Sequence, residues 1–236
     1  MIRPNSLYPL LLLAGTLVLA SCSPALIISV HDDYSSDIAF SSNPSPAGSA
    51  LMRRFAGAGD ASGPLYDRTA VSGGISAMGI DIETLSFPSG DGLSLTGRTA
   101  STGRIPGGAL FPSPSTPGIT LTLSPESVSA IMGNLPPETR DLLELLMAPV
   151  LTGEALEREE YRDILAAAYG ERAAEEMTSS TCTVQVRAPR PVHSVRLTGP
   201  DSDTIPLENE GSTVTAAIPL DLLLTLREPL NLTVSW

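Results

Sequence analysis

Leu230-Asn231-Leu232-Thr233-Val234-Ser235-Trp236, the last seven residues of the chain, alternate apolar and polar side chains without interruption. Because successive side chains of a β-strand point to opposite faces of a sheet, this alternation predicts a strand with one buried face. The stretch ends at the only Trp of the chain. We expect this strand to be paired within a sheet, so that removal of the C-terminus destabilises the fold.

Further strands are predicted toward both ends of the chain. Residues 25–30 form an apolar run of strand length, and the alternating Ile38 and Phe40 predict a return strand after a turn at 32–36. Other strands are expected at 80–87, with a bulge near residues 83–84, at 93–95 after a turn at 90–92, and at 182–186, 193–197 and 214–218. A short Leu-rich helix or turn follows at 219–226.

The middle of the chain has the signals of helices. Ser124-Pro125-Glu126 combines an N-cap residue, a Pro at the first helical position and an acid in the first turn. A Leu-rich helix is expected from residue 136, and a third helix is capped by Thr152 and ended by Gly170. A short fourth helix is expected at 171–177. One face of the third helix is predicted to contain Leu156, Tyr161, Ile164, Leu165 and Ala168.

Two segments rich in Ser, Pro, Gly and Ala separate these elements. We interpret residues 43–79 mainly as loop, with a short helical stretch near residues 50–55, and residues 104–118 as a proline-rich connection. The order of strands, helices and strands predicts an α+β domain. In this prediction the N- and C-terminal strands form one antiparallel sheet, and a helical insertion at about 124–177 packs on one face. A subdivision of the domain near Gly118 is the alternative.

Composition limits the chemistry that the chain can perform. The sequence has 14 Lys and Arg residues and 26 Asp and Glu residues, which gives a formal net charge of −12. Such a surface repels phosphate backbones, so we expect no nucleic-acid partner. The sequence contains no Lys, which excludes a P-loop, a pyridoxal Schiff base and a Ser–Lys hydrolase. No motif for a cofactor is present, and none is expected.

The N-terminus has the pattern of a secretory signal. Arg3 precedes an apolar run at residues 10–20, which is shorter than the roughly 20 residues needed to span a bilayer. A short membrane anchor or a buried helix is the alternative interpretation of this run. Residues 1–21 are therefore predicted to be a signal peptide, and residues 22–236 the mature domain.

The end of the apolar run, Leu19-Ala20-Ser21-Cys22, resembles the lipobox of bacterial lipoproteins. This resemblance implies cleavage between Ser21 and Cys22, diacylation of the Cys22 thiol and acylation of the new amine. Two or three acyl chains anchor a protein stably to a membrane. The Ser23 that follows Cys22 favours the outer membrane under enteric-type sorting. We therefore expect a lipoprotein of the bacterial envelope, facing the periplasm or the cell surface.

Few residues are candidates for chemistry beyond the anchor. His31-Asp32-Asp33 has the residue types of a metal site, but three adjacent residues in a turn rarely converge on one ion, so a solvated turn is the favoured interpretation. His193 is interpreted as structural. Cys182 has no intramolecular partner once Cys22 is lipidated, and we interpret it as a buried small apolar residue. A reactive thiol or an intermolecular disulfide is the alternative. The acids at 154–163 and 171–176 are predicted to lie on solvated helix faces.

These observations favour a non-enzymatic binding or scaffold domain for a lipid or protein partner. A groove between the helices and the sheet could hold a lipid tail or a peptide. Two alternatives remain at this point. One is an envelope hydrolase that uses a carboxylate pair or a metal at His31-Asp32-Asp33, and the other is a structural lipoprotein that oligomerises through its Leu-rich helices.

Overall fold

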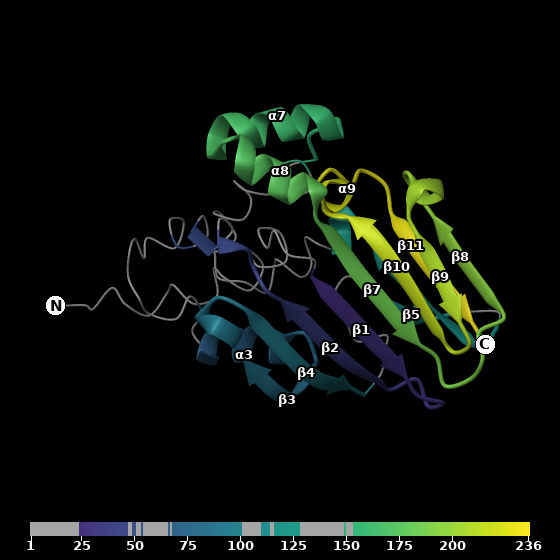
Figure 1. Ribbon diagram of the computed structural model, residues 1–236. Helices are drawn as coiled ribbons and strands as arrows, with labels where there is room; N and C mark the ends of the chain where they lie inside the picture. The colour runs from purple at the N-terminus through teal and green to yellow at the C-terminus, as the bar shows by residue number, and fades with distance from the viewer. Residues whose placement is uncertain are drawn as a thin grey trace.

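The computed structural model describes residues 24–46, 49–50, 53, 66, 68–100, 110–113, 116–127, 149 and 153–236. The signal segment, Ser21, Cys22 and the helix expected from residue 136 lie outside these residues. The described chain has α+β architecture, with two mostly antiparallel sheets and helices packed beside them. Figure 1 shows the larger sheet in front, with the helices of the C-terminal half of the chain above the upper ends of its strands and a helix of the N-terminal half at its lower left.

The larger sheet, sheet A, has seven strands in the order β3-β4-β2-β1-β7-β10-β9. All neighbours are antiparallel except β1 and β7, which run parallel with Ile28 opposite Val186. This parallel pair joins the N-terminal strands to the C-terminal ones. The strands are β1 (Ala25–Val30), β2 (Ser36–Ser42), β3 (Asp81–Ser86), β4 (Leu93–Thr99), β7 (Thr181–Arg187), β9 (Leu207–Glu210) and β10 (Thr213–Pro219).

The smaller sheet, sheet B, has four antiparallel strands in the order β5-β6-β11-β8. They are β5 (Leu110–Pro112), β6 (Gly118–Leu123), β8 (Ser194–Thr198) and β11 (Leu230–Ser235). The C-terminal strand β11 lies between β6 and β8, and Leu230, Leu232 and Val234 are buried. The prediction of a paired terminal strand with one buried face is therefore confirmed.

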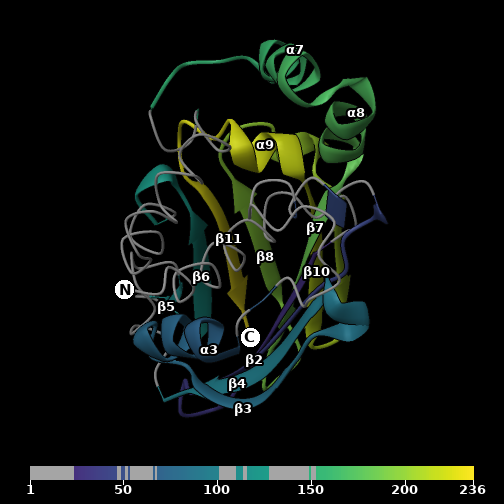
Figure 2. The same ribbon diagram turned by 90° about the vertical axis from the view of Figure 1, so that its left-hand side faces the viewer.

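One hydrophobic core lies between the two sheets. In sheet A, Ile38, Ile28, Val186 and Val214 follow each other across four strands in register, and all four are buried. In sheet B, Leu121 and Leu232 occupy the equivalent inward positions. These residues belong to a single cluster of buried apolar side chains. Figure 2 shows the two sheets facing each other, with helix α3 (Arg68–Ala77) beside one open side.

Three helices cover one end of the strands. Helices α7 (Arg158–Tyr169) and α8 (Glu171–Ser179) pack against each other and against the short α9 (Leu220–Leu224), which follows β10 directly. Gly170, with φ of 91°, separates α7 from α8, as predicted. Two single turns of 3-10 helix, η1 (Pro88–Gly90) and η4 (Ser202–Thr204), lie in connections. Together α7, α8 and α9 close the upper end of the sheets in Figure 1.

Several local predictions are confirmed. The β1–β2 hairpin is present, and β3 has its register shift between Ile82 and Thr84. Ser124 accepts a hydrogen bond from the backbone N–H of Ser127 at 3.1 Å, which is the interaction of an N-cap residue. The predicted short Leu-rich helix at 219–226 is present as α9, and a turn at Gly211 and Ser212 joins β9 to β10.

Other elements differ from the predictions. The C-terminal strands divide between two sheets, because β7 and β10 join sheet A while β8 and β11 join sheet B. Helix α3 lies in the segment interpreted as loop, where the burial of Val71 and Ile75 compensates for its glycines. Strand β5 lies inside the segment interpreted as a connection, and β6 and β9 were not predicted.

The third helix begins at Arg158 and not after Thr152. Its N-cap is Glu157, whose side chain and that of Glu160 form a reciprocal capping box with the backbone. Residues 153–157 are therefore extended or irregular. Tyr161 and Leu165 are buried as predicted, whereas Ile164 and Ala168 are exposed.

Candidate functional site

The hairpin between β1 and β2 shapes the candidate site. The Tyr34 N–H donates to the His31 carbonyl at 3.0 Å, and the His31 N–H donates to the Ser35 carbonyl at 2.9 Å. Tyr34 has φ of 61°, so the loop is a tight turn followed by one left-handed residue. Asp33 Oδ1 accepts hydrogen bonds from the Ser35 N–H and hydroxyl at 2.9 and 2.6 Å, which fixes the turn.

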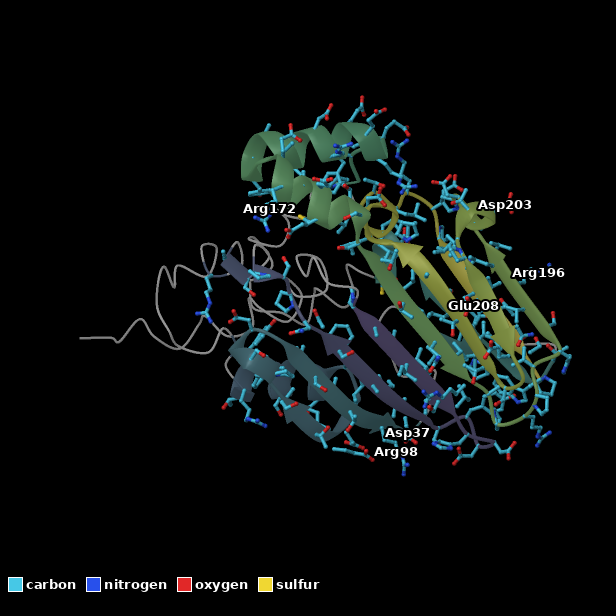
Figure 3. The ribbon with its side chains drawn as sticks, viewed as in Figure 1. Asp37, Arg98, Arg172, Arg196, Asp203 and Glu208 are labelled. Atoms are coloured by element: carbon cyan, nitrogen blue, oxygen red, sulfur yellow. The ribbon has the colours of Figure 1, made fainter. Side chains whose placement is uncertain are left out.

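A chain of charged side chains extends from this hairpin across sheet A. His31 Nε2 lies 2.9 Å from Asp37 Oδ2, and Arg98 Nε donates to Asp37 Oδ1 at 2.7 Å. Asp37 and Arg98 are register partners on β2 and β4, and Figure 3 shows them side by side. The Arg98 guanidinium, followed by the His31 hydrogen bond, holds the pKa of Asp37 below its usual range, whereas desolvation opposes this effect.

An open depression of about 430 Å³ lies over the hairpin. It is lined by His31, Asp32, Asp33, Ser35 and Arg98. The Ser35 hydroxyl is the first cause that lowers the pKa of Asp33, so this carboxylate is ionised at neutral pH. The depression therefore combines carboxylates with the side chains of His31 and Arg98 and is accessible to solvent.

His31, Asp32 and Asp33 bond to three different partners. His31 pairs with Asp37, Asp32 Oδ1 accepts from Arg190 at 2.9 Å, and Asp33 accepts from Ser35. Over the described ranges, no group of three or more His, Cys, Asp or Glu residues is placed to hold a metal ion. The geometry of the hairpin is therefore that of a stabilised turn with a surface ion network.

The other residues singled out in the sequence lie apart from this depression. Cys182 is buried on β7, and burial raises the pKa of its thiol to about 11. His193 is exposed just before β8, and its N–H donates to the Ser235 carbonyl at 3.0 Å. Among the acids, Glu157 pairs with Arg227, and Glu176 accepts from Ser45 and Arg172.

A partly buried ion pair has no counterpart among the sequence predictions. Arg158 at the start of α7 donates two hydrogen bonds to Asp221 of α9, at 2.7 and 2.8 Å, and Asp221 is buried. The Leu222 N–H also donates to Asp221 at 2.8 Å. The separation of 63 residues leaves no local signal for this pair. Its position between α7 and α9 indicates a structural role.

The end of the chain nearest the predicted lipid attachment is fixed to sheet A. Pro24 is buried, and its carbonyl accepts a hydrogen bond from the Thr183 N–H at 2.8 Å. Strand β1 begins at the next residue. Cys22 and Ser21 lie outside the described residues, so lipidation at Cys22 and cleavage after Ser21 stay predictions.

Comparison of the chain with protein-family models, curated proteins and solved structures finds no match in any of the three. None of the helices in the described parts of the chain is both long and apolar enough to cross a membrane.

Proposed function

We propose that the protein is a lipid-anchored, non-enzymatic binding domain of the bacterial envelope, attached through Cys22. The observation that supports this most directly is the fixed position of Pro24, whose carbonyl bonds to Thr183 in sheet A. Only Ser23 separates Pro24 from Cys22. An acylated Cys22 would therefore hold the folded domain directly against the bilayer, with no tether between them.

This anchor would also orient the domain. The start of β1 lies beside the start of β7, which follows α8, so the anchored end is the end covered by α7, α8 and α9. Strand β1 has six residues, which corresponds to a length of about 20 Å. The His31 hairpin and its depression would then lie at the far end of the domain, directed away from the anchoring membrane.

Electrostatics supports attachment by lipid rather than by charge. On α7 and α8, the exposed acids outnumber the exposed Arg162 and Arg172; these acids are Glu159, Glu160, Asp163, Glu171 and Glu175. Such an acidic surface is repelled by anionic headgroups, as is a chain with a net charge of −12. Acyl chains buried in the bilayer would overcome this repulsion.

Metabolic labelling in a bacterial host tests the proposal. Cells that express the full chain are fed an alkyne analogue of palmitate, and the protein is recovered and coupled to a fluorophore. We expect label on the wild-type protein and on Cys182→Ala, and none on Cys22→Ala, because the chain has only two cysteines. Label on Cys22→Ala, or an unlabelled wild-type protein of uncleaved mass, would overturn the proposed attachment.

A further inference from the structure

The outer face of sheet B differs in chemistry from the rest of the molecule. Along each strand, the side chains of this face alternate with inward-facing ones such as Leu121 and Leu232. The outward side chains are mostly half-buried on the middle strands β6 and β11 and exposed on β8. Among the described residues, nine side chains form this face: Phe111, Thr120, Thr122, Ser194, Arg196, Thr198, Asn231, Thr233 and the buried Ser235. Seven of the nine bear hydroxyl or amide groups, and none is a carboxylate.

The polar groups on this face form ordered rows. Phe111, Thr120, Thr233 and Arg196 are register partners on β5, β6, β11 and β8 in turn. The Thr120 and Thr233 hydroxyls are 3.1 Å apart, and the Thr122 hydroxyl donates to Asn231 at 2.7 Å. The first row crosses three interstrand spacings, or about 14 Å. It therefore presents an aromatic ring at one end, a cation at the other and hydroxyls between them.

Charge sets this face apart from sheet A. On the outer face of sheet A, Asp81, Arg98 and Asp37 are neighbours in one row, and Arg98 is paired with Asp37. On sheet B, none of the ion pairs within the described residues involves Arg196. Figure 3 shows Arg196 on the outer side of β8. Although the chain has 26 acids, the described residues place none of them on this face of sheet B. The Arg196 guanidinium is therefore available to bind an anion.

We propose that the outer face of sheet B binds an acidic polysaccharide. Thr and Asn side chains donate and accept hydrogen bonds, as the hydroxyls of a sugar require. Arg196 can bind a sugar carboxylate with two parallel hydrogen bonds. Phe111 is 37% exposed and offers a ring against which the apolar side of a sugar can pack.

Other occupants fit this face less well. A protein interface has an apolar centre, whereas Phe111, at one edge, is the only large apolar side chain that the described residues place on this face. Nucleic acid binding depends on several contacts between phosphates and cations, and this face has one cation. Binding of an acidic polysaccharide would depend mainly on the hydroxyl and amide rows, with one carboxylate contact at Arg196. The inference rests on the proposed binding function and names the ligand class, but it does not require lipidation. If the palmitate labelling fails, polysaccharide binding by sheet B can therefore still be tested.

Isothermal titration calorimetry on the full chain in a non-ionic detergent tests the proposal. The probes are polygalacturonate, neutral dextran, and polyglutamate as an anion without sugars. We expect polygalacturonate to bind most tightly of the three. Arg196→Gln should weaken this binding about tenfold, because a charge-assisted hydrogen bond is lost. Phe111→Ala should weaken it about threefold through lost packing.

Arg162→Gln is the matched control. It removes the same charge from an exposed position on α7, which is not part of sheet B. We expect it to bind polygalacturonate like the wild type, and far-UV circular dichroism should be the same for all variants. Absence of binding to polygalacturonate would overturn the proposal, as would equal binding of polyglutamate. Equal weakening by Arg162→Gln and Arg196→Gln would also overturn it, because general electrostatics would then account for the binding.

Discussion

The rings of Tyr34 and Trp236 contact each other, with centroids 6.2 Å apart and planes tilted by 36°. Tyr34 lies in the β1–β2 hairpin of sheet A, and Trp236 follows the last strand of sheet B. The Trp236 N–H also donates to the Pro117 carbonyl at 3.0 Å. This contact joins the two sheets at the end that lies opposite α7, α8 and α9.

Trp236→Ala should destabilise the fold, because it removes the large buried ring that links the sheets. We expect the free energy of unfolding to fall by about 3 kcal/mol. Urea denaturation followed by far-UV circular dichroism measures the change, and Trp236→Phe, which keeps a ring, should lose less. Equal stability of Trp236→Ala and the wild type would contradict a structural role for this contact.

Two substitutions at Tyr34 separate backbone strain from packing. Both Tyr34→Ala and Tyr34→Gly remove the ring that faces Trp236. Because Tyr34 has φ of 61°, glycine adopts this backbone conformation at lower cost than alanine. We expect Tyr34→Gly to be more stable than Tyr34→Ala by about 1 kcal/mol in thermal or urea unfolding. The opposite order would mean that the hairpin loop changes conformation in the variants.

Arg158→Met should destabilise the packing of α7 on α9. Among the described residues, it leaves the buried Asp221 with only the Leu222 N–H as a hydrogen-bond donor. Since Arg158 itself is partly exposed, we expect a loss of about 2 kcal/mol, below the value for a fully buried pair. Arg227→Met is the control, because it breaks the exposed pair with Glu157 and should cost about 0.5 kcal/mol or less. Similar losses in urea denaturation would refute the structural role assigned to Asp221.

The lowered pKa of Asp37 predicts a pH dependence of stability. Its folded pKa is below the ordinary 3.8, so its contribution is present above that value and is lost as the pH falls through the folded pKa. We expect the wild type to lose more stability than Asp37→Asn between about pH 6 and pH 3. Urea midpoints at both pH values measure the difference. The same loss in both proteins would show that other carboxylates dominate.

Cys182 should react slowly with alkylating agents. A thiol with a pKa of about 11 is protonated at neutral pH, and the side chain is buried. Iodoacetamide labelling followed by mass spectrometry should modify Cys182 only when the protein unfolds in urea. Rapid modification of the folded protein would indicate that the end of β7 opens readily.

Local patterns allowed much of the fold to be predicted. The alternation of Leu230, Leu232 and Val234 with polar residues identified β11, and Gly170 separated two helices. Strand β6 has the same alternating signal in Ile119, Leu121 and Leu123, directly after the proline-rich segment that hides it. Val71 and Ile75, spaced four residues apart, were the signal for α3 among its glycines.

The candidate site was less predictable. The sequence marked His31, Asp32 and Asp33 as neighbours, but it contained no information on Asp37, Arg98 or Arg190 as their partners. Arg190 is 158 residues from Asp32, and the pairing of β2 with β4 brings Arg98 to Asp37. The acid-free face of sheet B likewise emerges only when β5, β6, β8 and β11 are placed in register.

By itself, the sequence determined the α+β class, the inward faces of its recognised strands and the absence of lysine chemistry, because these follow from residue type and local period. The tertiary structure decided the division into two sheets, the parallel pairing of β1 with β7, the Arg158–Asp221 pair and the contact of Tyr34 with Trp236. The physical reason is that local periodicity fixes which side of a strand is buried. Which strand lies beside it depends on contacts between residues far apart in the chain.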